Sequence, residues 1–179
     1  MSQGSFERIR VLIVEDNAHM SSILRTILQG FGVRSVIETR DAADAFELMR
    51  NANPDLALVD YMLGDVDGLE FTRLNRTASD SPNKYLPIVM VSGHTDRSKV
   101  FEAINAGVNE YLAKPVRPVD LYNRLVTLIE KPRRFVKTPG YFGPGLTQPR
   151  GQRLLKPDEH LVAFSRMHQL RPWQHRQPV

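Results

Sequence analysis

The sequence has 179 residues, of which 41% are hydrophobic and 25% are charged, a balance typical of a globular protein. It has no cysteine, which excludes disulfides and thiolate metal sites and makes a cytoplasmic location the default expectation. No run of about 18 apolar residues occurs, and the N-terminus lacks a signal-peptide core, so we expect no membrane insertion.

The net charge of +4 is spread unevenly along the chain. Residues 1–130 hold 14 Lys and Arg against 18 Asp and Glu, whereas residues 131–179 hold 10 against 2. Such a division predicts a mildly acidic folded body with a basic interaction segment attached to it.

The first half of the chain alternates short apolar runs with helical patterns. The sequence predicts a buried strand at 9–14 and a helix at 18–29, where apolar residues recur at helical spacing. A weaker strand follows at 33–37, and a helix at 41–51 is broken by Pro54.

The second half repeats this alternation. A strand at 55–60 precedes a loop and a helix over 69–78, and a further strand is predicted at 86–91. A helix ending near 107, a short strand at 110–113 and an amphipathic helix over 120–130 complete the pattern.

Five strand–helix units in alternation predict an α/β domain over residues 9–130, with a doubly wound five-stranded parallel sheet covered by helices on both faces. In such folds the functional groups lie outside the carboxyl ends of the strands. We therefore expect the chemistry of this protein at the strand ends.

Residues 131–179 form a basic tail rich in proline and glycine. This composition predicts an irregular segment, without a regular packed element over 132–157. Residues 158–170 could equally form a short helix or stay irregular. Asp158 can cap such a helix, and apolar residues follow it at helical spacing.

Polar residues lie at the carboxyl ends of four of the predicted strands: Glu15 and Asp16 after the first, Asp60 at the end of the third, Ser92 after the fourth and Lys114 after the fifth. Each alone is explained by a capping or turn role. Together they place three carboxylates at one sheet edge, and the repulsion among them is offset by a bound cation or phosphoryl group.

The residue types indicate phosphoryl chemistry. Carboxylate oxygens suit Mg²⁺, and a carboxylate such as Asp60 can attack a phosphoryl group to form an acyl phosphate. Lys114 can neutralise a phosphoryl oxygen, and the Ser92 hydroxyl can donate a hydrogen bond to another.

Four motifs carry a resemblance to a known family. They are VLIVEDN at 11–17, LVDYMLGDVDGLE at 58–70, VMVSGH at 89–94 and YLAKPV at 111–116. Residues 9–130 resemble the receiver domain of two-component response regulators, of the chemotaxis-regulator type. The resemblance implies a flavodoxin-like (βα)5 fold and a role in phosphorelay signalling rather than in metabolism.

The resemblance also implies roles for individual residues. Asp60 would accept a phosphoryl group from a sensor histidine kinase or a histidine phosphotransfer protein. Glu15, Asp16 and Asp60 would hold Mg²⁺ together with the backbone carbonyl of Met62. A downstream protein would be the target of the phosphorylated form.

Three further roles follow from the same resemblance. Lys114 would bind the phosphoryl group and precede a cis peptide bond to Pro115. Ser92 would be the switch hydroxyl, and Tyr111 the switch aromatic residue. A packed aromatic side chain without a switching role is the alternative for Tyr111.

The sequence departs from the family pattern after the acceptor strand. Gly64 stands where the family usually has proline, which predicts a looser loop. Met62 has no polar side chain to assist an attacking water, and Gly93 leaves space for a donor or phosphatase to approach.

Other functions stay open at this point. A phosphatase of the haloacid dehalogenase type would need a second acid where this chain has Met62. A transcriptional regulator could use the basic tail, 132–179, on DNA, and interleaved cations and aromatic residues there could bind single-stranded nucleic acid. A phosphorylation-independent scaffold is a further alternative, although we favour a tail that contacts a protein partner or stays solvated.

Overall fold

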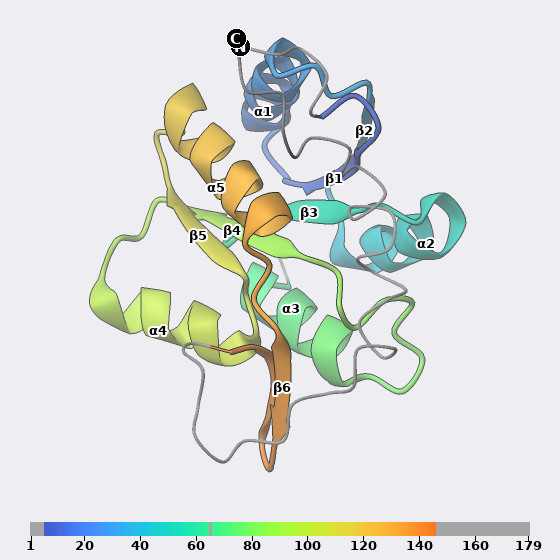
Figure 1. The fold of residues 1–179 in the computed structure, drawn as a ribbon, viewed down its shortest axis with the longest axis vertical. Coiled ribbons are helices and arrows are strands. Elements are labelled where there is room, and N and C mark those ends of the chain that lie inside the picture. The colour runs from blue at the N-terminus through green and yellow to red at the C-terminus, as the bar shows by residue number, and fades with distance from the viewer. Residues whose placement is uncertain (1–5, 65, 146–179) are drawn as a thin grey trace, which may run out of the picture.

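The computed structural model describes residues 6–64 and 66–145 of the chain (Figure 1). Strands and helices alternate along this part until a final pair of strands. In chain order they are β1 (Arg10–Val14), α1 (Ala18–Gly30), β2 (Ser35–Thr39), α2 (Ala42–Ala52), β3 (Leu56–Asp60), α3 (Gly68–Thr77), β4 (Ile88–Ser92), α4 (Arg97–Ala106), β5 (Glu110–Ala113), α5 (Pro118–Glu130), β6 (Phe135–Thr138) and β7 (Tyr141–Pro144).

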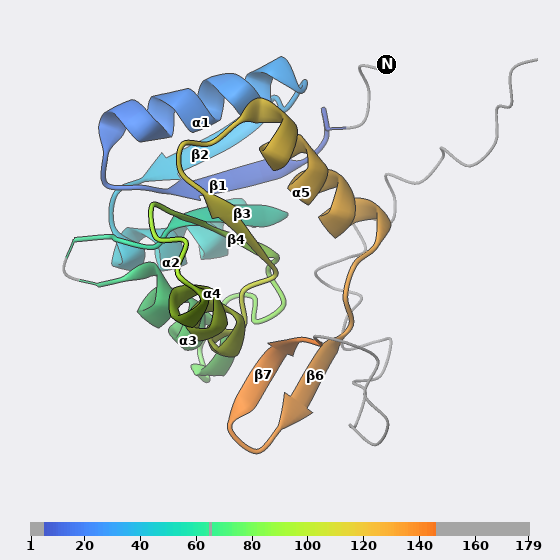
Figure 2. The same ribbon diagram turned by 90° about the vertical axis from the view of Figure 1, so that its left-hand side faces the viewer.

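Strands β1 to β5 form one parallel sheet in the order β2-β1-β3-β4-β5. The central strands β3 and β4 are buried along their whole length, as expected for apolar strands covered on both faces. Helices α1 and α5 cover one face of the sheet, and α2, α3 and α4 cover the other (Figure 2). The prediction of a doubly wound five-stranded parallel sheet is confirmed.

The predicted elements match the observed ones with shifts of a few residues at their ends. Helix α5 begins at Pro118, two residues before the predicted start. Proline is favourable in the first turn of a helix, because its missing N–H would lack an intrahelical partner there in any case. Helix α2 ends at Asn53, which adopts a left-handed conformation with φ of 46°.

A β-hairpin follows α5, and here the sequence prediction is wrong. Strands β6 and β7 pair antiparallel, so residues 135–144 are a regular packed element rather than irregular chain. The side chain of Phe135 is fully buried, with ring centroids 5.3 Å from Tyr85 and 5.6 Å from Phe142. The possible helix at 158–170 lies outside the described residues.

The hairpin packs against the carboxyl-terminal ends of α3 and α4 (Figure 2). A Cβ atom added to Gly143 in β7 would lie 2.8 Å from the Cα of Gly107, the residue that ends α4. Only glycine permits so close an approach of the two backbones. This contact ties the hairpin to the α/β body.

None of the helices in the described part of the chain has the length and apolar character that a membrane span requires.

Candidate functional site

The parallel register gathers acidic residues at one edge of the sheet. Val14 in β1 pairs with Val59 in β3, so Glu15 and Asp60 lie next to each other just beyond that pair. Oxygen atoms of Glu15, Asp16 and Asp60 lie within 4.8 Å of one another. Glu15 and Asp60 are buried, whereas Asp16 is exposed, so the cluster opens to solvent on one side.

Lys114 bridges the two buried carboxylates of this cluster. Its Nζ lies 3.0 Å from Oε2 of Glu15 and 3.0 Å from Oδ1 of Asp60. The pairing of β4 with β5 places Lys114 directly after β5, where its backbone N–H donates to the carbonyl of Ser92 at 2.7 Å. The Lys114–Pro115 peptide bond is cis, as predicted.

Burial and charge act against each other in this site. Burial raises the pKa of Glu15, and the hydrogen bond from Lys114 offsets only part of that rise. Burial lowers the pKa of Lys114, but the hydrogen bonds to Asp60 and Glu15 outweigh it, so that pKa is raised overall. Three carboxylates therefore gather at this edge, and Lys114 pairs with only two of them, which leaves the site with an affinity for further positive charge.

The predicted switch residues lie beside the loop that follows β4. Ser92 is fully buried, and its Oγ accepts a hydrogen bond of 3.0 Å from the backbone N–H of His94. The hydroxyl of Tyr111 donates to the backbone carbonyl of His94 at 2.6 Å. Both side chains thus bind the backbone of His94, in the loop between β4 and α4.

A contact between the acceptor loop and α4 was not anticipated from the sequence. The hydroxyl of Tyr61, the residue after Asp60, donates to Oε2 of Glu102 in α4 at 3.1 Å. Lys99 pairs with the same oxygen at 3.0 Å. The spacing of Lys99 and Glu102 could have predicted their pairing on a helix, but nothing local to Tyr61 indicates its partner.

The loop after β3 has a conformation that proline cannot adopt. Gly64 has φ of 57°, in the left-handed region, whereas proline is held near about −65°. The glycine at this position therefore selects a different loop path from the usual family residue. Met62, earlier in the loop, has a side chain that is 55% exposed.

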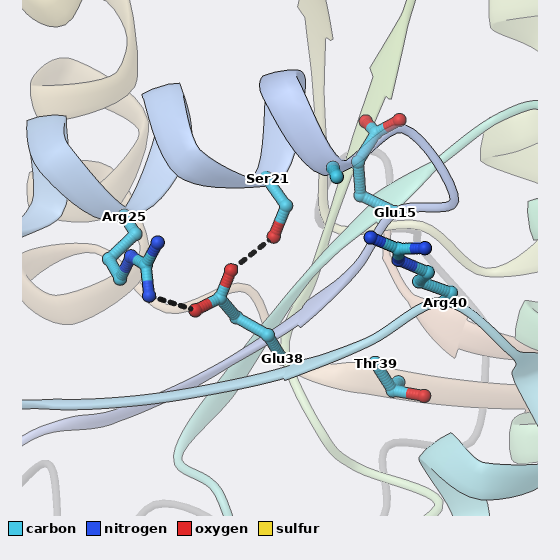
Figure 3. A pocket seen from close by; sticks show the side chains of 7 residues that line it. Glu15, Ser21, Arg25, Glu38, Thr39 and Arg40 are labelled. Atoms are coloured by element: carbon cyan, nitrogen blue, oxygen red, sulfur yellow. Dashed lines mark hydrogen bonds and ion pairs between the residues drawn. The ribbon is translucent and has the colours of Figure 1, made fainter.

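A cavity of about 320 Å³ lies beside the acidic cluster, between α1 and β2 (Figure 3). Glu38 projects into it, where it accepts a hydrogen bond from Ser21 and pairs with Arg25 at 3.0 Å. Arg40 lines the same cavity with Glu15, and has no carboxylate at salt-bridge distance within the described residues. A cationic group thus stands next to the mouth of the acidic site.

The donor set suits a small, hard cation. Three carboxylates offer oxygen ligands from the ends of two adjacent strands, and the exposed side leaves room for coordinated water. Mg²⁺ prefers such a site, with one or two carboxylates and several waters. The residues present therefore fit the ion that the sequence predicts.

Sequence comparison agrees with the resemblance that the four motifs carry. Residues 11–126 match the response regulator receiver domain family. The chain is 30% identical over 122 residues to chemotaxis protein CheY1 of Helicobacter pylori, which covers 68% of this chain and 97% of that protein. It is 32% identical over 118 residues to the DNA-binding response regulator MtrA of Mycobacterium tuberculosis, but there it covers only 49% of that protein.

Solved structures show the same fold. A putative response regulator from Chloroflexus aurantiacus aligns with a TM-score of 0.63 and 28% identity, over 69% of this chain and 98% of that one. The receiver domain of sensor histidine kinase PA1611 from Pseudomonas aeruginosa aligns with a TM-score of 0.58 and 28% identity, over 66% and 94%. That structure has a magnesium ion coordinated in its active-site cleft. The present chain belongs to the response regulator receiver domain family, a family of signalling phosphoacceptors in two-component systems.

Proposed function

We propose that Asp60 is the phosphoacceptor of this receiver domain and that the donor is a phosphohistidine on a sensor histidine kinase or a histidine phosphotransfer protein. The observation that carries this proposal is the position of Lys114, whose Nζ lies 3.0 Å from Oδ1 of Asp60. A lysine ammonium in that place can contact a phosphoryl oxygen on the neighbouring carboxylate.

The transfer itself follows from the placement of these groups. An oxygen of Asp60 attacks phosphorus, the P–N bond to the donor histidine breaks, and its electron pair stays on the imidazole nitrogen. Such a transfer depends on positioning and charge neutralisation more than on acid–base assistance. Lys114 supplies one positive charge beside the carboxylate oxygen that attacks.

Glu15, Asp16 and Asp60 would hold Mg²⁺, with the backbone carbonyl of Met62 as a further ligand. When bound, the ion neutralises charge on the phosphoryl oxygens and on the crowded carboxylates. The exposure of Asp16 and of the loop that carries Met62 supports this assignment, because a donor protein could reach the ion from that side.

Ser92 and Tyr111 would carry the signal away from Asp60. Both bind His94, through its backbone N–H and its carbonyl respectively, so a shift of either residue moves the loop before α4. The Ser92 hydroxyl would donate to a phosphoryl oxygen, and movement of its Oγ toward Asp60 would lengthen the hydrogen bond that it accepts from the backbone N–H of His94. The resulting change in the surface near α4 would alter affinity for a downstream protein.

Labelling with a small phosphodonor tests the acceptor. The full chain incubated with acetyl phosphate and Mg²⁺ should gain one phosphoryl group by intact mass spectrometry, and Asp60→Asn should abolish it. Asp41→Asn is the matched control, because Asp41 is an exposed carboxylate that caps α2. Labelling that persists in Asp60→Asn would rule out the proposed acceptor.

A pull-down tests the downstream role. Beryllofluoride mimics a phosphoryl group on Asp60, so the protein should retain its target more strongly with beryllofluoride and Mg²⁺ than without. Asp60→Asn should remove that difference while leaving basal retention unchanged. Equal retention under all conditions would show that phosphorylation does not control this contact.

A further inference from the structure

A second cavity lies far from the acidic cluster, between the hairpin and the last turn of α3. Its volume is about 500 Å³, within the range of small-molecule sites. Asp60 contacts the start of α3 and Arg76 lies near its end, so the helix separates the two sites by about 12 Å. The hairpin wall of this cavity lies beyond residue 126, where the family match ends.

The floor of this cavity is the buried guanidinium of Arg76, which no carboxylate pairs with among the described residues. The guanidinium of Arg76 donates to the carbonyls of Gly107 and Lys84 at 3.0 and 2.8 Å, and to Oδ1 of Asn109 at 3.0 Å. All three acceptors are uncharged. Burial lowers the pKa of Arg76 to about 9, which agrees with a positive charge that no carboxylate balances.

Two lysines add to the positive charge. Lys84 and Lys137 line the cavity from two elements, the loop before β4 and strand β6, and its lining within the described residues includes no acidic side chain. Neither lysine has a carboxylate at salt-bridge distance within residues 6–64 and 66–145. Three like charges around one cavity repel one another, and a bound anion would offset that repulsion.

Aromatic rings also line the cavity. Tyr85, Tyr141 and Phe142 contribute to its walls, and the hydroxyl of Tyr141 is already used in a hydrogen bond of 2.8 Å to the carbonyl of Pro144. The rings of Tyr85 and Phe142 contact each other with centroids 5.4 Å apart, so together they give this wall an aromatic, largely apolar surface. Such faces can stack on a planar ring, as aromatic residues do with nucleotide bases.

We propose that this cavity is a binding site for a small phosphorylated ligand that carries a planar ring, of the mononucleotide class. Lys84 and Lys137 contact the phosphate, and the aromatic wall contacts the ring. Binding joins the hairpin to the loop before β4, and it does not depend on the proposed role of Asp60.

Isothermal titration calorimetry on the full chain tests this site with adenosine monophosphate as the probe. Buffer without divalent cations keeps the phosphate away from the acidic cluster. Saturable binding is expected, and the double substitution Lys84→Gln with Lys137→Gln should weaken it by about tenfold or more, because charge-assisted hydrogen bonds are lost. Lys131→Gln is the matched control, since that exposed lysine does not line the cavity.

Several outcomes would overturn the proposal. They are the absence of saturable binding at millimolar probe, binding that survives the double substitution, and binding that Lys114→Gln removes instead. Adenosine without its phosphate should bind at least about tenfold more weakly, and equal affinity would exclude recognition of the phosphate. Inorganic phosphate that binds as tightly as the nucleotide would exclude a role for the aromatic wall.

Discussion

Nζ of Lys114 lies 3.0 Å from Oδ1 of Asp60, and this ion pair joins the end of β5 to the end of β3. The same ammonium group lies 3.0 Å from Oε2 of Glu15, so a single cation connects three strands of the sheet at one edge. The two carboxylates are buried and close together, and burial and then the charge of Asp60 raise the pKa of Glu15, which the hydrogen bond from Lys114 partly offsets. The position and the charge of Lys114 therefore bear both on phosphoryl transfer and on the stability of the fold.

Lys114→Gln should slow phosphoryl transfer from acetyl phosphate by about 100-fold, a loss typical when one charge-stabilising donor is removed. Glutamine can still reach Asp60, but it brings no charge to a phosphoryl oxygen. The rate of mass gain under excess donor and Mg²⁺ measures the effect. Lys99→Gln serves as the control, because Lys99 is an exposed lysine paired with Glu102. A wild-type rate in Lys114→Gln would remove Lys114 from the transfer.

The raised pKa of Lys114 predicts how stability responds to alkaline pH. A lysine whose folded-state pKa exceeds its usual value of 10.5 stabilises the fold fully below pH 10.5, and that contribution is lost as the pH rises through the raised value. Urea unfolding of wild type and Lys114→Gln in buffer without Mg²⁺ should give a difference in free energy that shrinks above that pH. A difference that stays constant from about pH 9 to about pH 12 would contradict the assigned ion pairs.

The parallel sheet of five strands and the members of the acidic cluster could be predicted from local patterns. Apolar runs fixed where strands lie, and parallel strands share one carboxyl edge, so Glu15, Asp60 and Lys114 had to converge. The contact of Tyr61 with Glu102 could not be predicted, because it depends on how α4 sits against a loop 41 residues away in sequence.

The hairpin was missed for a related reason. Pro139 and Gly140 look like breakers of regular structure, and here they form the turn between β6 and β7. Stability of this pair of strands comes from contacts distant in sequence, with Phe135 against Tyr85 and against the guanidinium of Arg76, 5.0 Å from the ring centroid. The residue pattern within the hairpin itself does not indicate that Tyr85 and Arg76 are its partners.

Phe135→Ala should therefore destabilise the protein by about 3–5 kcal/mol, the usual cost of deleting a fully buried aromatic side chain. The lost free energy of unfolding should include the packing of Tyr85 and Phe142, whose rings contact Phe135. Urea unfolding measures it, with the exposed neighbour Lys137→Ala as a control expected within about 0.5 kcal/mol of wild type. If both substitutions have the same small effect, the hairpin does not belong to the cooperative fold.

Arg76 allows a sharper test, because two opposing effects act on one buried residue. Arg76→Met removes a desolvated cation, which favours the folded state, but leaves the buried carbonyl of Gly107 and the part-buried carbonyl of Lys84 without this donor. Asn109 keeps a hydrogen bond from the N–H of Ile88. Each orphaned acceptor costs about 1–3 kcal/mol, so we expect a net loss of about 2–4 kcal/mol.

Arg73→Met on the same helix is the matched control for Arg76→Met. Its guanidinium is half exposed and lies 3.9 Å from Glu70, a surface pair worth less than about 1 kcal/mol. Hydrogen exchange adds a local readout, because Arg76 packs under Phe135 and its loss should speed exchange of the hairpin amides. Arg76→Met with wild-type stability would mean that desolvation of the guanidinium costs as much as its hydrogen bonds contribute. Unchanged hairpin exchange would show that Phe135 alone anchors the two strands.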